Sequence, residues 1–172
     1  MLVANPVRRQ WVSYEGELGE VSATGVSQAD MRALTMKSGT VARFVATGSS
    51  TRGDFGLYRW EMPANTGGAT GHFHRTFSES FYVLDGSPSF FDGESWTEAS
   101  PGFFLYVPRG GIHGFRNDSR APAAFLILFS PGIAREGYFE ALAEIGNTGR
   151  QMSKADWAEL YARFDQTMVD GS

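Results

Sequence analysis

The middle of the chain alternates apolar and polar residues with a period of two, which is typical of strands that bury one face. Between residues 55 and 62, Tyr58, Trp60 and Met62 fall on one face, and charged residues fall between them. Further strands are expected at residues 41–47, 71–75, 79–84, 89–91, 103–107, 114–117 and 123–129. Asp-Gly pairs and Gly-rich turns separate these runs. The pattern predicts an all-β, antiparallel sandwich or barrel.

The pattern changes on both sides of this strand-rich zone, which we bound at residues 39–132. Residues 1–38 have weak periodicity and are expected to form an N-terminal arm, with a short helix or turn near 27–36. Residues 133–172 have apolar residues spaced three and four apart, which predicts a C-terminal helical extension packed on the strand domain. We expect Gly146 to cap the first of these helices at its C-terminal end.

A second helix is predicted to begin at Ser153, because Asp156 occupies the capping-box position three residues later. Its apolar stripe consists of Trp157, Leu160, Tyr161, Phe164 and Met168. We expect this stripe to pack on the outside of the strand domain, and a contact with a second copy of the chain is the alternative.

Composition bounds the function classes. The chain has 172 residues, enough for one domain, with 42% hydrophobic and 14% aromatic residues. The net charge of −4 argues against a nucleic-acid partner, and the absence of cysteine excludes disulfides and thiolate chemistry. The N-terminus has no apolar run of signal-peptide length, and the longest apolar run, residues 123–129, is far too short to span a membrane. We therefore expect a cytoplasmic protein without a membrane partner.

All three histidines of the chain and one glutamate have spacings that suit a metal site. His72 and His74 are two residues apart, so a strand would point both imidazoles to the same face. Glu79 follows on the next short strand, and His113 follows a Gly-rich turn. Imidazoles with a carboxylate suit Fe, Mn, Ni, Cu, Co or Zn as a divalent ion. A lone histidine is more often a core or surface residue than a metal ligand. The surrounding sequence pattern therefore decides whether these residues form a metal site.

That surrounding pattern resembles the two sequence motifs of the cupin superfamily. The first motif is His-x-His, four residues, Glu, six residues, Gly, and segment 71–86 fits it. The second is Gly, five residues, Pro-x-Gly, two residues, His, three residues, Asn, and segment 102–117 fits it. One departure is Thr66, which stands where the first motif normally opens with Gly.

The resemblance implies a jelly-roll type cupin β-barrel that binds one divalent metal ion through His72, His74, Glu79 and His113. The interior of a small barrel has room for a metal and one small ligand. Phe81 and Val83 share the strand face of Glu79, and Phe115 shares that of His113, so these three are expected to line the substrate cavity. Tyr58 and Trp60 are further candidates. For each of them, plain core packing is the alternative.

The tail narrows the resemblance. Ser130-Pro-Gly followed by Tyr138-Phe139-Glu-Ala-Leu is similar to the tail of small bacterial monocupins of the quercetinase-like (quercetin 2,3-dioxygenase-like) group. This implies a metal-dependent dioxygenase that acts on a small phenolic or enolic substrate. Glu79 would be both a ligand and the catalytic base, with a pKa that burial raises. The alternatives are a redox-neutral cupin, such as a polyketide cyclase-like enzyme or an isomerase, and a non-catalytic small-molecule binder.

A homodimer is also expected. Trp11, Val12 and Tyr14 of the N-terminal arm have no clear role within the chain. Small barrels expose edge strands that gain from being covered.

Overall fold

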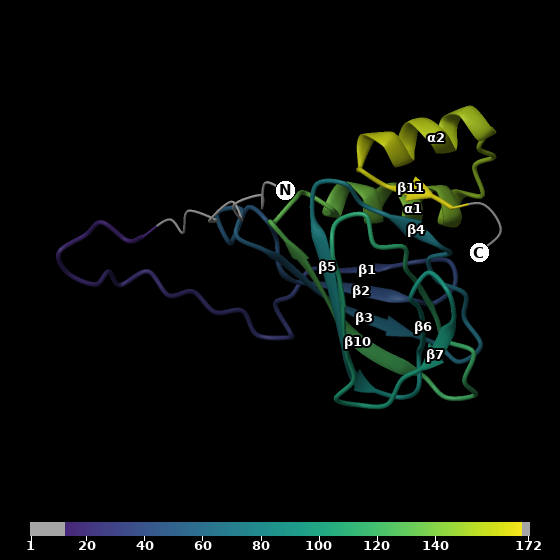
Figure 1. The fold of residues 1–172 in the computed structure, drawn as a ribbon, viewed down its shortest axis with the longest axis horizontal. Coiled ribbons are helices and arrows are strands. Elements are labelled where there is room, and N and C mark those ends of the chain that lie inside the picture. The colour runs from purple at the N-terminus through teal and green to yellow at the C-terminus, as the bar shows by residue number, and fades with distance from the viewer. Residues whose placement is uncertain (1–12, 170–172) are drawn as a thin grey trace, which may run out of the picture.

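The computed structural model describes residues 13–169, which form antiparallel sheets followed by two helices (Figure 1). In chain order the elements are β1 (Ala33–Thr35), β2 (Val41–Ala46), β3 (Gly56–Met62), β4 (His72–Phe73), β5 (Ser78–Asp85), β6 (Ser89–Phe91), β7 (Trp96–Glu98), β8 (Phe104–Val107), β9 (Gly114–Arg116), β10 (Ala123–Ser130), α1 (Glu136–Thr148), α2 (Lys154–Arg163) and β11 (Thr167–Met168). The prediction of a mostly β fold with C-terminal helices is confirmed.

Three antiparallel sheets make up the strand region. The largest has the order β1-β2-β3-β10-β5-β8, a second has β7-β6-β9, and β11 pairs with β4 alone. A further bridge joins His72 of β4 to His113, just before β9. Strands from distant parts of the sequence therefore meet around β4. The closure of these sheets into a barrel stays a prediction.

The period of two found in the sequence decides which face of the large sheet is buried. In β3 every second residue, including Tyr58 and Trp60, is buried. The register places Glu79 of β5 opposite Phe129 of β10, and Phe81 opposite Ile127. Glu79 therefore lies on the inner, apolar face of the sheet, where a carboxylate needs polar partners.

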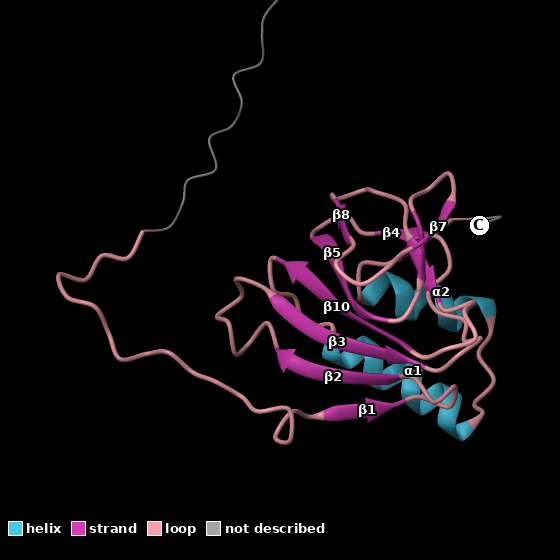
Figure 2. Ribbon diagram, turned by 90° about the horizontal axis from the view of Figure 1, so that it is seen from below, coloured by secondary structure: helices cyan, strands magenta, loops and turns pink. Residues whose placement is uncertain are grey.

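Helix α1 packs against this inner face (Figure 2). The ring of Phe139 lies 5.2 Å from that of Tyr58 and 5.1 Å from that of Trp60, measured between centroids, and the Tyr58 hydroxyl donates a hydrogen bond to Glu136. Edge-to-face aromatic contacts of this kind add about 0.5–1.5 kcal/mol each beyond burial. Helix α1 thus closes one side of the inner face.

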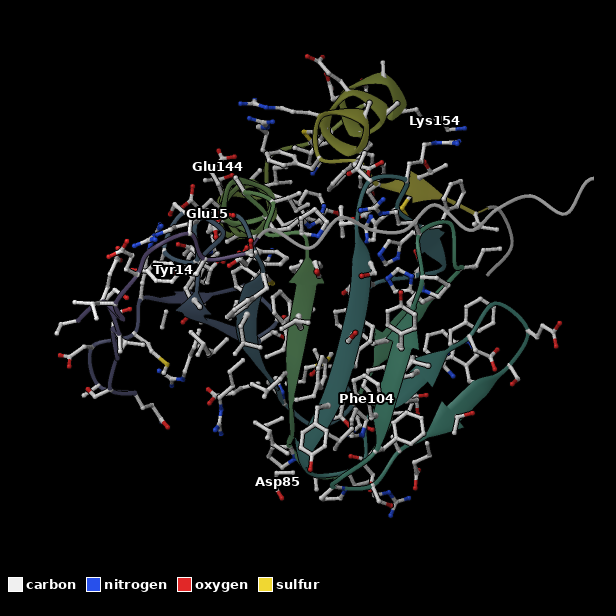
Figure 3. All side chains as sticks on the ribbon, turned by 60° about the vertical axis from the view of Figure 1, so that its left-hand side comes forward. Tyr14, Glu15, Asp85, Phe104, Glu144 and Lys154 are labelled. Atoms are coloured by element: carbon white, nitrogen blue, oxygen red, sulfur yellow. The ribbon has the colours of Figure 1, made fainter. Side chains whose placement is uncertain are left out.

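The apolar stripe of α2 packs against the main core and against α1. Leu160, Tyr161 and Phe164 pack against the main core, and the Phe164 ring lies 5.6 Å from that of Tyr138 on α1. Charged residues such as Glu144 and Lys154 occupy the outer side of the helices (Figure 3). Within residues 13–169, neither helix is long and apolar enough to cross a membrane.

One predicted helix boundary is wrong and another is confirmed. The prediction of Gly146 as a cap is wrong, because α1 continues to Thr148 and Gly149, with a φ of 70°, donates its backbone N–H to Ile145. The predicted capping box of Ser153 and Asp156 is confirmed.

The end of α2 and the N-terminal arm also differ from expectation. Asp165, with a φ of 50°, ends the helical path, so Met168 belongs to β11 and not to the helical stripe. Near residues 27–36 the chain forms a turn at Ser27–Asp30 and then β1, which pairs with β2. The large sheet therefore begins inside the predicted arm. Trp11 and Val12 lie outside the described residues, and Tyr14 is 60% exposed.

Gly86, which ends the first motif, offers a test of the turn after β5. It has a φ of 74°, and a Cβ there would collide with the Pro122 carbonyl oxygen. We expect Gly86→Ala to lower the free energy of unfolding by about 1–2 kcal/mol from the backbone alone and by about 1–3 kcal/mol more from the contact. Urea unfolding followed by circular dichroism measures the loss.

The matched control is Gly102→Ala. Gly102 has a φ of 92°, but a Cβ added there would meet no atom within 4 Å, so only the backbone cost applies. Equal losses for the two variants would contradict the role of the close approach at Pro122.

Candidate metal centre

The four predicted ligands meet in one buried cluster. His72 lies in β4 and His74 directly after it, Glu79 lies near the start of β5, and His113 precedes β9. One possible ligand atom from each lies within 4.8 Å of the others, and none of the four residues is more than 4% exposed. The backbones of His72 and His113 exchange two hydrogen bonds, of 3.0 and 2.9 Å, which fixes their separation.

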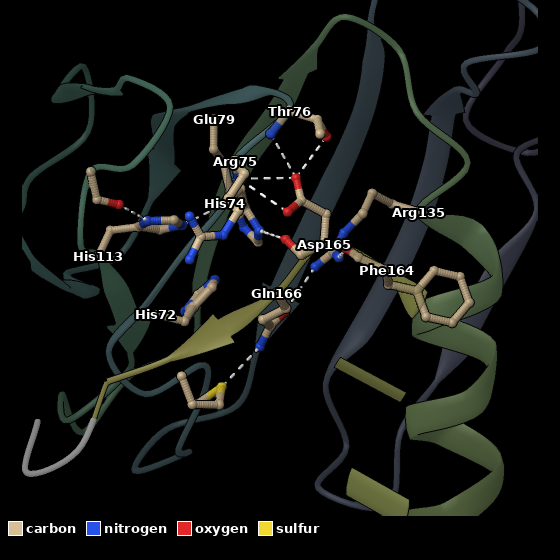
Figure 4. Close-up of polar contacts among 12 residues, drawn as sticks. His72, His74, Arg75, Thr76, Glu79, His113, Arg135, Phe164, Asp165 and Gln166 are labelled. Carbon is tan, nitrogen blue, oxygen red and sulfur yellow. Dashed lines mark hydrogen bonds and ion pairs between the residues drawn. The ribbon is translucent and has the colours of Figure 1, made fainter. Parts of the chain in front are cut away.

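Each imidazole is oriented by a backbone carbonyl at its Nδ1. The three contacts are His72 to Thr70 at 2.7 Å, His74 to Asp165 at 2.6 Å, and His113 to Gly111 at 3.0 Å. Figure 4 shows the contact between His74 and Asp165. Because a carbonyl oxygen only accepts, each Nδ1 carries the hydrogen, and the lone pair of a neutral ring is on Nε2. Metal-binding histidines are commonly held in this way.

The Nε2 atoms of two of the imidazoles contact a carboxylate. The Nε2 atoms of His74 and His113 lie 3.1 and 2.9 Å from the same oxygen, Oε2 of Glu79. Two acceptors at such a distance repel each other unless a proton or a cation lies between them. Three nitrogen lone pairs and one carboxylate directed at a common centre fit a divalent transition metal ion.

Burial and mutual charge set the protonation states in the cluster. Burial, together with the charge of His113, lowers the pKa of His72 to about 3, so this ring is neutral. Burial also lowers the pKa of His113, but the charge of Glu79 and its hydrogen bond outweigh burial and raise the pKa overall.

For Glu79, burial acts to raise the pKa, but the charges and hydrogen bonds of His113 and His74 hold it well below its usual range. The expectation of a raised pKa is therefore wrong for this site. Desolvation is present, but two imidazoles contact the carboxylate directly and reverse its effect.

The C-terminal segment supplies part of the site, which the sequence analysis missed. The backbone carbonyl of Asp165 orients His74, and β11 pairs with β4 so that Met168 lies opposite His72. The Asp165 carboxylate accepts hydrogen bonds from the backbone N–H groups of Arg75 and Thr76, which fixes the loop between two ligands. No local signal marks Asp165, because it lies 91 residues from His74.

A cavity of about 250 Å³ adjoins the cluster, and His72 and Glu79 form part of its wall. Of the five residues expected to line it, Trp60 and Phe115 do so. Tyr58, Phe81 and Val83 are not in the wall and are fully buried in the core.

Contacts within the core account for the positions of two of these residues, Tyr58 and Phe81. Glu136 and Phe139 of α1 cover Tyr58. Phe81 packs against Phe90, with ring centroids 5.0 Å apart, and Phe81 lies 5.9 Å from the His113 ring. Phe81 thus supports the cluster from the core side.

The C-terminal segment replaces them as the cavity wall. The wall residues that sequence reasoning missed include Arg135, Tyr138, Phe139, Trp157, Tyr161 and Gln166. The helical spacing of the tail carried no sign that these side chains face a cavity.

Comparison with known proteins supports one family. A family model for the cupin domain matches residues 58–129. Quercetin 2,3-dioxygenase of Bacillus subtilis (strain 168) is 30% identical over 102 residues, which is 59% of this chain and 29% of that protein. The chain thus spans under a third of the length of this relative.

Solved structures agree on the fold. KdgF from Halomonas sp. has a TM-score of 0.55 at 18% identity, covering 63% of this chain and 94% of its own. The polyketide cyclase RemF from Streptomyces resistomycificus has a TM-score of 0.54 at 26% identity, and the match covers 63% of this chain and 79% of RemF. An RmlC-like cupin from Shewanella frigidimarina has a TM-score of 0.56 at 16% identity, and the match covers 67% of this chain and 96% of that protein.

The matched residues contain all four members of the buried cluster, at the spacings of both motifs. The fold around them is similar to that of solved cupins. Residues 58–129 therefore form a cupin domain.

Proposed function

We propose that the protein is a metal-dependent oxygenase that acts on a small phenolic or enolic substrate within a cupin barrel. One divalent ion would be held by His72, His74, Glu79 and His113. The observation that carries the proposal is the convergence of three carbonyl-oriented imidazoles and one carboxylate beside an aromatic cavity. The similarity to quercetin 2,3-dioxygenase supports the choice of reaction.

The protein's own groups have separate tasks in this proposal. Trp60, Phe115 and the rings of the C-terminal helices bind a flat substrate and exclude water from the cavity. Glu79 takes the proton of the substrate hydroxyl. Both of its imidazole contacts are at Oε2, so Oε1 is free to accept this proton. A bound divalent ion would act as a Lewis acid that makes a hydroxyl on it more acidic.

The lowered pKa of Glu79 fits this task in one respect and limits it in another. The carboxylate is ionised at neutral pH and thus ready to accept a proton. It is also a weaker base than a carboxylate with a raised pKa, so it needs a substrate hydroxyl that is itself acidic. Phenols and enols meet this requirement better than alcohols.

A redox-neutral reaction is the second candidate. The polyketide cyclase RemF is 26% identical to this chain over the matched structure, which favours it. In such an enzyme the same base would move protons without consumption of O2, and the metal would act only as a Lewis acid.

Metal content and oxygen uptake distinguish the two candidates. We expect protein purified without added metal to contain Fe, Mn, Ni or Cu and to consume O2 with a phenol or an enol. His72→Ala/His74→Ala should lose the metal and the uptake, because half of the donor atoms are gone. Elemental analysis and an oxygen electrode measure both on one preparation. Zinc alone without uptake would contradict the oxygenase, and full metal retention by the double variant would contradict the site.

Glu79→Gln separates the role of base from that of ligand. Glutamine keeps the shape of the side chain but cannot accept the proton, so turnover should fall about 100-fold or more while part of the metal stays. The measurement is rate per bound metal ion. If the rate falls only in proportion to metal content, Glu79 is a ligand and not the base.

The expected homodimer has a candidate surface, although not the one inferred from the arm. Tyr82 of β5 and Phe104 and Tyr106 of β8 are 45%, 59% and 56% exposed, and Tyr82 lies opposite Phe104 in the sheet. Figure 3 shows Phe104 on the outer face of the large sheet. Strand β8 is at the edge of that sheet. We propose that a second copy of the chain covers this aromatic edge, since exposed apolar edges otherwise promote aggregation.

Sedimentation equilibrium at micromolar concentration tests the dimer. Phe104→Glu should raise its dissociation constant about 10-fold or more, because a charge replaces an apolar contact. Phe55→Glu is the matched control, since Phe55 is 37% exposed but lies outside this edge. A monomeric wild-type protein, or equal weakening by both variants, would count against the surface.

A further inference from the structure

Arg135 is a buried cation in the wall of the cavity. It directly precedes α1 at the helix N-cap position, and its side chain lies beside the cluster (Figure 4). Only 3% of the residue is exposed, and it lines the same cavity as His72 and Glu79. Arginine is almost never buried to this extent unless it is paired with an anion.

The hydrogen bonds of Arg135 leave much of the guanidinium unused. Its Nη1 donates to the Phe164 carbonyl at 2.7 Å and its Nη2 to Oε1 of Gln166 at 3.0 Å. Its Nε has no hydrogen-bond partner among residues 13–169. Since a guanidinium has five N–H donors, these two bonds fix the direction of the group without satisfying it.

Aromatic rings stabilise the charge only in part. The guanidinium carbon lies 4.3 Å from the ring centre of Tyr138 and 5.5 to 5.8 Å from those of Phe77, Phe129 and Phe139. Cation–π contacts offset some of the lost hydration. They do not neutralise the charge.

No carboxylate of the described chain forms an ion pair with Arg135. The nearby acidic groups are engaged elsewhere. Glu79 contacts two imidazoles through Oε2, Asp165 accepts from the backbone of the loop after His74, and Glu136 accepts from Tyr58. The anion that would complete the environment of Arg135 is therefore not supplied by residues 13–169.

The charge of the cavity indicates where that anion comes from. Among the lining residues, Glu79 is the only carboxylate and Arg135 the only guanidinium or ammonium group. With neutral imidazoles, these two charges cancel. A divalent ion in the cluster would then leave the cavity with a net positive charge in an apolar surrounding, which favours an anionic ligand.

We propose that Arg135 binds a carboxylate of the substrate, so that the substrates are small aromatic or enolic acids. This inference rests on the proposed function, because the substrate's phenol or enol is assigned to the metal side of the same cavity. A carboxylate matches the guanidinium in charge and in hydrogen-bond geometry. The cavity of about 250 Å³ is smaller than the about 300–1,000 Å³ of sites for drug-sized ligands, which favours a molecule of one ring.

Salicylate and salicylamide form a matched probe pair, because both carry the phenol and only salicylate carries the carboxylate. Calorimetric titration of the zinc-loaded chain should show that Arg135→Gln weakens salicylate binding about 10- to 100-fold and leaves salicylamide binding unchanged. Arg135→Lys keeps the charge but not the planar guanidinium, so its affinity for salicylate should lie between those of the wild type and Arg135→Gln. The control is Arg163→Gln, which removes the same charge from the exposed end of α2 and should change neither.

Metal-free wild-type protein gives a second arm that does not depend on the folding of a variant. With no ion present to attract the carboxylate, salicylate should still bind about 10-fold more tightly than salicylamide. Equal binding of the two probes, or no binding of salicylate, overturns the role of Arg135. Metal retention and oxygen uptake by the same wild-type protein decide separately whether the proposed function holds.

Discussion

Three backbone carbonyl groups determine the direction in which the candidate metal site presents its imidazole nitrogens. Each accepts from an Nδ1, so each ring offers Nε2 to the shared centre near Glu79. Because these carbonyls belong to the backbone, they cannot be removed by a change of side chain. Their positions follow from the strands and turns around β4, β9 and β11. The geometry of the site is thus set by main-chain pairing, whereas its chemistry comes from the four side chains.

Side chains of the C-terminal segment form part of the cavity wall. Residues of α1 contact Tyr58 and separate it from the cavity. Arg135, at the N-cap of α1, lines the cavity, as do Trp157 and Tyr161 of α2. The strand region and its ligands match the family, whereas the matched residues end at 129, before both helices. We therefore expect the C-terminal helices to determine which ligand the cavity binds, and the sheets to determine the geometry of the candidate metal centre.

The sequence predicted local features well, because they depend on neighbours. The period of two in β3, the His-x-His pair and the capping box at Ser153 each need only a few adjacent residues. Contacts between distant segments were missed for the opposite reason. The bond from His74 to Asp165 joins residues whose spacing carries no period, and Arg135 has the sequence setting of an ordinary residue before a helix. Both contacts depend on residues 164–166, which lie far from His74 and Arg135 in the sequence.

The pairing of β11 with β4 also has a consequence for the order in which the molecule is made. All four candidate ligands leave the ribosome before residues 165–168 do. Until then His74 lacks the carbonyl that orients its ring, and its two nitrogens are equivalent choices for any metal ion nearby. We therefore expect the incomplete chain to bind metal ions weakly and without the defined ligand geometry of the folded site. We therefore expect any choice between metal ions to be made by the nearly finished protein and not by the growing chain.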